Sequence, residues 1–225
     1  MIVVAFRLDV EQEAAFSEFY HHRYLPALMR AAPAVRAARR YQEHHVTGSL
    51  KYYRKQFLTL LECESVEEAR QVLSMVDEDA EWQKWRATLY DLDPPCVYRQ
   101  RWAHPRAAWD GNFGSRPFFM VSVELGATQA EPFHQWYEQD YLPKNVADVP
   151  SWVACRRYSS EGREPARHLA IYEAFDLAAL DASLDMMRAP FRMAENMAWK
   201  RWDSGDLPAI TWEDAATYKP IFRRP

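Results

Sequence analysis

Two stretches of the sequence, "FYHHRYLPALMRAAPAVRAARRY" (Phe19–Tyr41) and "WYEQDYLPKNVADVPSWVACRRY" (Trp136–Tyr158), are similar to one another. A shift of 117 positions aligns Phe16–Tyr41 with Phe133–Tyr158 without a gap, and ten of the 26 aligned pairs are identical. The chain therefore contains an internal repeat, and each copy is expected to form one structural unit.

The similarity continues on both sides of the matched stretches. Upstream, "VAFRL" (Val4–Leu8) aligns with "VSVEL" (Val121–Leu125) at the same offset. Downstream, "LTLLE" (Leu58–Glu62) aligns with "LAIYE" (Leu169–Glu173) at an offset of 111, so six residues are lost in the loop that precedes these strands. The repeat therefore extends over most of the chain.

A segment with Gly and Pro punctuation, "HPRAAWDGNFGSRP", separates the two copies. We therefore predict a first ferredoxin-like repeat at 1–103, a linker at 104–117 and a second ferredoxin-like repeat at 118–225. These are called copy one and copy two.

Hydrophobic periodicity predicts the same element order in both copies. A helix follows the first strand in each copy, and its buried stripe is expected to hold Phe16, Phe19, Tyr20 and Tyr24 in copy one and Phe133, Trp136, Tyr137 and Tyr141 in copy two. Strands are expected at about 2–8, 34–45, 54–62 and 96–102, and at about 117–125, 151–159, 167–174 and 214–221.

Helix boundaries are indicated by capping residues and prolines. Ser65 and Asp176 are expected to cap the second helical region of each copy. Pro26 and Pro143, and then Pro33 and Pro150, are expected to discourage continuation of the first. The resulting order, β-α-β-β-α-β, is that of the ferredoxin-like motif.

The fold class that follows is α+β. A four-stranded sheet with both helices on one face leaves its other face bare, and an apolar face must be covered. Two copies in one chain satisfy this need by packing sheet to sheet. We therefore predict an intramolecular, pseudo-dimeric α/β barrel.

The composition limits the classes of partner. The chain has 225 residues and a net charge of −4, with acidic and basic residues interspersed. It has no basic stripe for a nucleic-acid backbone, and no apolar run approaches the roughly 20 residues that cross a bilayer. We expect neither nucleic acid nor a membrane as partner.

The N-terminal sequence and the cysteines indicate the compartment. The chain begins with a strand-like pattern rather than a signal peptide. Cys63, Cys96 and Cys155 are odd in number and widely spaced, which is typical of reduced thiols. We expect a cytoplasmic protein that is a monomer or a homodimer.

One pattern resembles a known family. Copy two reads "F-x-x-WY-x-x-x-Y-L-P", then "V-P-x-x-V-x-x-RRY" and "H-L-A-I-Y-E". This is similar to EthD-like members of the dimeric α/β-barrel superfamily. The resemblance covers both copies and implies a cavity lined by strand and helix residues. The histidine that such relatives often carry before x-Pro is replaced by Tyr24 and Tyr141, which makes these tyrosines candidate hydrogen-bond donors to a substrate.

Differences between the copies indicate where chemistry lies. His168 and Tyr172 are four apart on a strand and share a face, whereas copy one has Phe57 and Leu61 at these positions. We interpret His168 as an acid or base and Tyr172 as a hydrogen-bond donor.

The three residues before Tyr141 also differ from those of copy one. Asp140 is a candidate auxiliary base beside Tyr141, and Arg23 is its counterpart in copy one. A solvated charge, or an ion pair between Arg23 and Asp140, is the alternative. Tyr141, Asp140, His168 and Tyr172 are therefore the predicted catalytic residues.

Substrate contacts are predicted for aromatic residues and for two arginines that occur at equivalent positions. Tyr24, Trp136 and Tyr137 offer aromatic surface, and Arg40 and Arg157 offer charge for a carboxylate or an enolate. A purely architectural role of the repeated arginines is the alternative.

The sequence gives no pattern for a bound metal or cofactor. His21-His22 and His44-His45 are adjacent pairs rather than metal-ligand spacings, so no metal site is expected. No cofactor is expected either, although His134 or His168 could serve as an axial ligand for haem.

These observations lead to a functional prediction. We expect a cofactor-independent lyase, isomerase or cyclase that performs proton transfer on a hydrophobic, aromatic or polyketide-like molecule, as in natural product biosynthesis. The reaction would be a cyclisation, dehydration, isomerisation or decarboxylation. The alternatives are a binding protein for an apolar ligand without chemistry, and a haem-dependent or cofactor-free monooxygenase.

Overall fold

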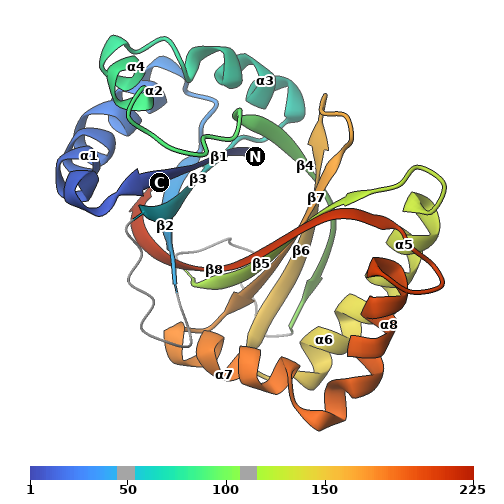
Figure 1. Ribbon diagram of the computed structural model, residues 1–225. Helices are drawn as coiled ribbons and strands as arrows, with labels where there is room; N and C mark the ends of the chain where they lie inside the picture. The colour runs from blue at the N-terminus through green and yellow to red at the C-terminus, as the bar shows by residue number, and fades with distance from the viewer. Residues whose placement is uncertain (45–53, 107–115) are drawn as a thin grey trace. The chain divides into compact units, whose positions relative to one another are not determined.

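A computed structural model describes residues 1–44, 54–106 and 116–225. The chain divides into two compact units (Figure 1). The first unit is Met1–Arg99 with Lys219–Pro225, and the second unit is Gln100–Tyr218. Each unit holds the helices of one copy of the repeat.

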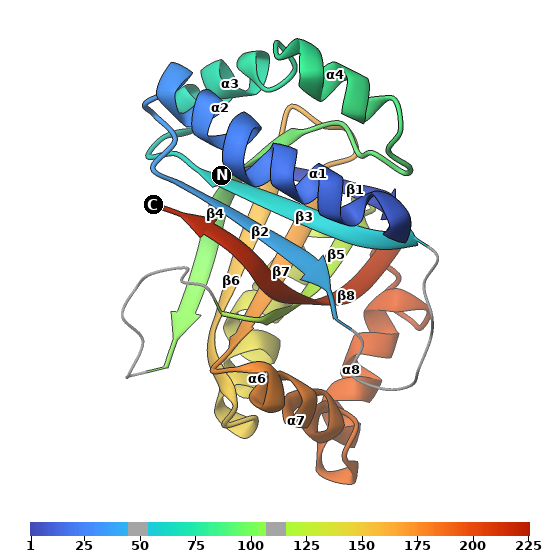
Figure 2. The same cartoon turned by 90° about the vertical axis from the view of Figure 1, so that its left-hand side faces the viewer.

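Copy one has the predicted element order, with its helical regions split into several pieces. Its elements are β1 (Ile2–Asp9), η1 (Val10–Gln12), α1 (Glu13–Phe19), η2 (Tyr20–Tyr24), α2 (Leu25–Ala31), β2 (Ala37–Glu43), β3 (Arg54–Glu62), α3 (Val66–Met75), α4 (Ala80–Arg86) and β4 (Cys96–Pro105). The helices α1 to α4 all lie on one face of the strands β1, β3 and β2 (Figure 2).

Copy two repeats this order and adds a short helix before its last long one. Its elements are β5 (Phe118–Leu125), α5 (Ala130–Trp136), η3 (Tyr137–Tyr141), α6 (Leu142–Asp148), β6 (Trp152–Glu161), β7 (Arg167–Ala174), α7 (Leu177–Met187), η4 (Pro190–Arg192), α8 (Met193–Asp203) and β8 (Ile210–Arg224). The strand order is β1-β3-β2-β8-β5-β7-β6-β4, a closed barrel. This confirms the predicted fold class.

Strand register confirms the alignment of the copies. Phe6 pairs with Phe57 between β1 and β3, and Val123 pairs with His168 between β5 and β7. Since Phe6 aligns with Val123 at an offset of 117, His168 occupies the place of Phe57. Residues directly opposite on antiparallel strands project to the same face of the sheet. Residues that differ between the copies at aligned positions therefore occupy equivalent positions in the sheet of each copy.

Both predicted helix caps are present. The Ser65 hydroxyl accepts a hydrogen bond from the Glu68 amide at 3.1 Å, and the Glu68 side chain completes a capping box. The Asp176 carboxylate accepts one from the Ala179 amide at 2.8 Å. These bonds satisfy amides that have no partner inside the helix, which sets the start of α3 and of α7.

The first helix of each copy differs from the prediction at its proline. The chain remains helical through Pro26 and Pro143 and leaves the helix only after Ala31 and Asp148. The expectation that Pro26 and Pro143 discourage the helix was wrong because a π-helical turn, η2 or η3, directly precedes each one. The proline then opens a new α-helical segment, where a missing amide hydrogen is tolerated. Pro33 and Pro150 follow the ends of α2 and α6, as expected.

The aromatic stripe of each first helix lies in the core, as predicted. In the first unit the Tyr20 ring stacks on Phe16 at 5.0 Å and on Tyr24 at 5.0 Å. In the second unit Tyr137 stacks in the same way on Phe133 at 5.1 Å and on Tyr141 at 5.3 Å. Both π-helical turns therefore present their two tyrosines to the interior of their own unit.

Two further expectations concern the membrane and the thiols. Within the described ranges, no helix is long and apolar enough to cross a membrane. Cys63, Cys96 and Cys155 are free thiols, and Cys155 is buried.

Candidate functional site

A cavity of about 270 Å³ lies in the second unit, between the strands β5, β7 and β8 and the helical segments η3, α7 and α8. Its apolar wall is formed by Phe119, Val121, Met187, Trp199 and Ala215. Its polar groups belong to Tyr137, Tyr141, Tyr172, Asn196, Lys200 and Glu213. The volume is close to the lower end of the range for small-molecule sites, roughly 300–1,000 Å³. Three of the predicted site residues, Tyr137, Tyr141 and Tyr172, thus share one cavity.

A chain of buried hydrogen bonds ends at one of these tyrosines. The Arg192 guanidinium donates to the Asn145 side-chain oxygen, and Asn145 Nδ2 donates to the Tyr172 hydroxyl at 3.1 Å. An arginine can only donate, so the amide oxygen must face Arg192 and the amide nitrogen must face Tyr172. Asn145 and Arg192 are fully buried, and Tyr172 is 1% exposed.

The direction of these bonds decides what Tyr172 can do. Its oxygen accepts from Asn145, so its own hydrogen is available to the Tyr137 oxygen, 3.3 Å away, or to an oxygen in the cavity. Burial raises the pKa of Tyr172 well above its usual value, and burial also raises the pKa of Tyr137 and of Tyr141. All three phenols are therefore protonated near neutral pH and act as donors rather than as bases.

Copy one has hydrocarbon at the matching positions. Leu61 stands in place of Tyr172, and Leu28 stands in place of Asn145. The Tyr24 hydroxyl, which matches that of Tyr141, donates to the Val76 carbonyl at 2.5 Å. The predicted substrate contact of Tyr24 is thus directed to the backbone of its own unit.

One carboxylate lines the cavity. Glu213 lies on β8 among the lining residues and is exposed. Partial burial, followed by the charge of Asp203, raises its pKa, whereas a hydrogen bond from Trp199 lowers it. A carboxylate with a raised pKa at a cavity is a candidate general base.

Sequence reasoning missed Asn145, Arg192 and Glu213. The first of these had a signal, since Asn145 aligns with Leu28 and is a polar substitution within the matched stretch. Arg192 lies in η4, which has no counterpart in copy one, and Glu213 lies before the predicted strand at 214–221. No comparison of the copies could have singled out these two residues.

His168 lies on the same strand as Tyr172 but is not among the residues that line the cavity. Its Nδ1 is 2.8 Å from the Ser159 hydroxyl, and its ring lies 4.5 Å from that of His134. Burial, followed by the charges of Arg157 and Arg101, lowers the pKa of His168 to about 3. The imidazole is therefore neutral at pH 7, and its pKa is poorly matched to acid–base catalysis there.

Arg157 forms the centre of that histidine cluster. Its Nη1 lies 2.9 Å from Glu138 Oε1 and 3.0 Å from His134 Nδ1. The guanidinium also lies 4.8 Å from the centroid of the Tyr137 ring. It is fully buried and does not line the cavity, so its observed contacts are with its own unit.

Arg40 takes the same place in copy one with weaker partners. Its Nη1 donates to the Ser17 hydroxyl at 2.9 Å and lies 3.1 Å from His21 Nε2. Among the described residues, four aromatic rings lie around it, and Phe57 is the nearest of these at 4.4 Å. Burial lowers the pKa of Arg40 to about 10, and burial followed by the charge of Arg40 lowers that of His21 to about 4.

The remaining predicted residues lie outside the cavity. Asp140 is exposed and pairs with Lys144 at 2.8 Å, whereas Arg23 pairs with Glu81 at 2.5 Å. Each charge thus has a partner in its own copy, and the alternative of an ion pair between Arg23 and Asp140 stays a prediction. Trp136 packs against Tyr141 at 4.9 Å and does not line the cavity.

The described residues offer little to a metal or to haem. No group of three or more His, Cys, Asp or Glu side chains that could hold a metal ion occurs among them. His134 and His168, the two candidate haem ligands, each have a side-chain partner, and neither lines the cavity. His45, one of the four adjacent histidines, lies outside the described residues.

Comparisons with known proteins show the fold. No family model matches the sequence, and no curated protein matches it. An anthrone oxidase-like protein has a similar structure, with a TM-score of 0.64, 13% identity and coverage of 99% of this chain and 92% of that one. A candidate monooxygenase from Fusobacterium nucleatum subsp. nucleatum has a TM-score of 0.59, 8% identity and coverage of 99% and 93%.

A mutant chlorite dismutase from Candidatus Nitrospira defluvii is also similar, with a TM-score of 0.52, 12% identity and coverage of 97% of this chain and 91% of that one. The chain therefore shares its fold with these proteins over almost its whole length. The finer EthD-like resemblance stays a prediction.

Proposed function

We propose that this protein is a small-molecule enzyme that stabilises an enolate or phenolate oxygen in the cavity of the second unit. The observation that carries the proposal is the donor chain from Arg192 through Asn145 to Tyr172. Each donor in the chain polarises the next, and a buried donor acts on developing negative charge more strongly than one in water.

The substrate that suits this cavity is apolar and carries a carbonyl or phenolic oxygen. Phe119, Met187 and Trp199 provide a mostly aromatic and apolar wall, and few polar groups remain to fix orientation. The oxygen of the substrate would accept a hydrogen bond from Tyr172, with Tyr141 as a second donor.

The reaction that these groups support is proton transfer next to a carbonyl. Glu213 would remove a proton from the carbon beside the carbonyl, and the electron pair of that bond would move to the oxygen, which becomes an enolate held by Tyr172. Return of the proton to another atom of the substrate gives isomerisation. If the next carbon carries a hydroxyl group, the electron pair of the enolate breaks that C–O bond, the proton held by Glu213 passes to the departing oxygen, and loss of water gives dehydration. No cofactor is required for these steps. Glu213 replaces Asp140 and His168 as the proposed base because it lines the cavity.

A proton-exchange assay tests the proposal without knowledge of the natural substrate. The aromatic ketone 2-tetralone is incubated with the protein in D₂O, and deuterium uptake beside its carbonyl is followed by NMR. We expect exchange well above the buffer rate, a loss of roughly 10²-fold or more in Tyr172→Phe, the scale of one oxyanion donor, and a comparable loss in Glu213→Gln. Asp140→Asn is the control and should exchange like the wild type. Exchange at the buffer rate would overturn the proposal.

A binding protein without chemistry is the second candidate. It is favoured by the three cavity phenols, whose raised pKa values make them donors but not proton acceptors. Binding of 4-nitrophenol tests the donors that both candidates require, because its colour reports the phenolate form, and exchange of 2-tetralone separates the two. Both candidates predict that bound 4-nitrophenol ionises at lower pH than free 4-nitrophenol and that Tyr172→Phe weakens this shift. Only the enzyme predicts exchange of the ketone.

A further inference from the structure

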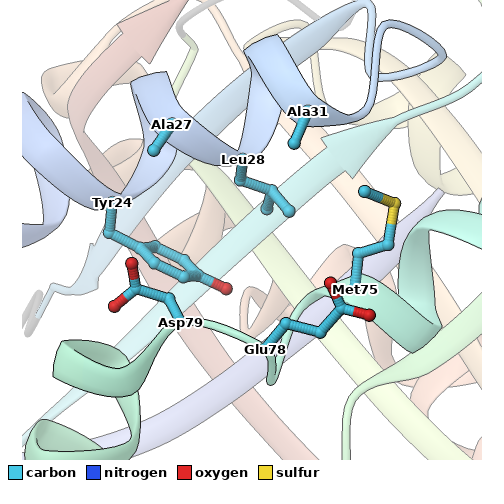
Figure 3. A pocket seen from close by; sticks show the side chains of 7 residues that line it. All are labelled: Tyr24, Ala27, Leu28, Ala31, Met75, Glu78 and Asp79. Carbon is cyan, nitrogen blue, oxygen red and sulfur yellow. The ribbon is translucent and has the colours of Figure 1, made fainter.

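A second cavity, of about 210 Å³, lies in the first unit between α2 and the connection from α3 to α4 (Figure 3). Its walls are the Tyr24 ring, Leu28 and Met75, together with two alanines of α2, Ala27 and Ala31. Glu78 and Asp79 complete the lining. This cavity shares no residue with the one in the second unit.

The two alanines explain why the cavity exists in this copy. Ala27 aligns with Lys144, and Ala31 aligns with Asp148. In the second unit Lys144 forms an ion pair with Asp140, and Asp148 forms one with Arg192. The same helix face therefore carries charged side chains that already have partners. Small side chains on α2 leave that space open.

The charge at this cavity is negative and only partly neutralised. Asp77 accepts hydrogen bonds from Trp82 Nε1 at 2.9 Å and from Arg86 at 2.6 Å. The Asp79 carboxylate is occupied by the amides at the start of α4, at 2.9 and 2.7 Å. Within the described part of the chain, the Glu78 carboxylate has no such partner, and Figure 3 shows it beside Met75 on the cavity wall.

We propose that this cavity binds a small apolar molecule that carries a protonated amine. The alkyl part would lie against Leu28, Met75 and the Tyr24 ring, and the ammonium group would pair with Glu78. Charge complementarity selects a cation because the lining holds two carboxylates and no basic side chain. The site is independent of the proposed chemistry in the second unit.

The test uses hexylammonium as the probe and methionine methyl NMR as the readout. Met75 lines this cavity and Met187 lines the other one, so one ¹³C-methyl-methionine sample reports both sites separately. We expect the Met75 signal to shift saturably with hexylammonium while the Met187 signal stays unchanged. 1-Hexanol and hexanoate have the same chain length without the positive charge and should bind more weakly.

Two variants and one control separate the contribution of the Glu78 carboxylate from that of the open volume. Glu78→Gln should weaken hexylammonium binding about two- to fivefold, the scale of one exposed ion pair, and Glu67→Gln, an exposed carboxylate on α3 away from the cavity, should change nothing. Ala31→Leu fills the cavity and should abolish the Met75 shift. An unchanged Met75 signal, equal affinity for 1-hexanol, or wild-type affinity of Glu78→Gln would each overturn the proposal, even if Ala31→Leu failed to fold.

Discussion

The two copies differ at two aligned positions: copy one has Leu61 and Leu28, and copy two has Tyr172 and Asn145. In copy one Leu61 and Leu28 are buried among other hydrocarbon groups. In copy two Tyr172 and Asn145 continue a donor chain from Arg192 to a cavity. One scaffold therefore tolerates both an inert core and a polar network in which hydrogen bonds join Arg192, Asn145 and Tyr172. Polarity that one copy has and the other lacks points to function more directly than polarity that both copies share.

The largest expected effect tests the buried arginines, which both copies share. Glu138→Ala leaves Arg157 without its carboxylate and should lower the free energy of unfolding by about 3–5 kcal/mol, measured by urea denaturation. His21→Ala removes the matching neutral partner of Arg40 and should cost less. Equal losses would mean that Glu138 contributes no more than a neutral hydrogen-bond partner.

The second effect concerns the donor chain. Arg192→Met removes the cation that holds Asn145, and 2-tetralone exchange should fall about tenfold or more, in the same direction as in Tyr172→Phe. Binding of 4-nitrophenol at low pH, where the probe is neutral, should change less than binding of its phenolate. A uniform loss at all pH values would indicate a structural role for Arg192 alone.

The third effect is a pH dependence of stability. The pKa of His168 is about 3 in the folded protein and 6.5 in the unfolded chain, so below pH 6.5 the unfolded chain takes up a proton that the folded protein does not. Stability from this residue is therefore complete above pH 6.5 and is lost as the pH falls toward 3.

His168→Phe restores the copy-one residue and should remove this dependence, which is worth about 2 kcal/mol at pH 5. The measurement is the difference between the unfolding free energies at pH 7 and pH 5 in the wild type and the variant. The same difference in both proteins would contradict the environment described for His168.

A smaller effect distinguishes the two tyrosines that precede Leu-Pro. Tyr24→Phe removes the bond to the Val76 carbonyl and should cost about 1 kcal/mol of stability with no change in 2-tetralone exchange. Tyr141→Phe should reduce exchange instead. If Tyr24→Phe lowered exchange as much as Tyr141→Phe, the second unit could not be the only reactive one.

The smallest effect is expected for an exposed pair. Asp140→Ala breaks the contact with Lys144 and should change stability by less than about 1 kcal/mol, because both side chains are half exposed. A large loss of stability, or of 2-tetralone exchange, would return Asp140 to the site.

The fold could be predicted because the same sequence pattern occurs in both copies of the repeat. The hydrophobic period, the aromatic stripe and the capping residues predicted the same elements in both copies. The prediction failed at Pro26 and Pro143, because no sequence pattern indicates a π-helical turn. Part of the site was also predictable. Tyr137, Tyr141 and Tyr172 lie on faces that periodicity specifies, and they meet at the cavity.

The rest of the site could not be predicted because two residues on the same face of a strand can still lie far apart along it. His168 and Tyr172 project from the same side of β7, but four residues of strand span roughly 13 Å. One therefore lies in the arginine cluster and the other at the cavity. Arg192 reaches Asn145 across 47 positions of sequence, and no local pattern predicts such a contact.

The π-helical turns also carry historical information. A π-turn holds one residue more than an α-turn, and such a turn is rare. Here it occurs at aligned positions, Tyr20–Tyr24 and Tyr137–Tyr141. Two separate insertions at the same place are a less economical explanation than one inherited insertion. The ancestral half-length chain therefore already contained the turn before the gene duplicated, and the chemical difference between Leu28 on α2 and Asn145 on α6 arose on a helix whose phase was already set.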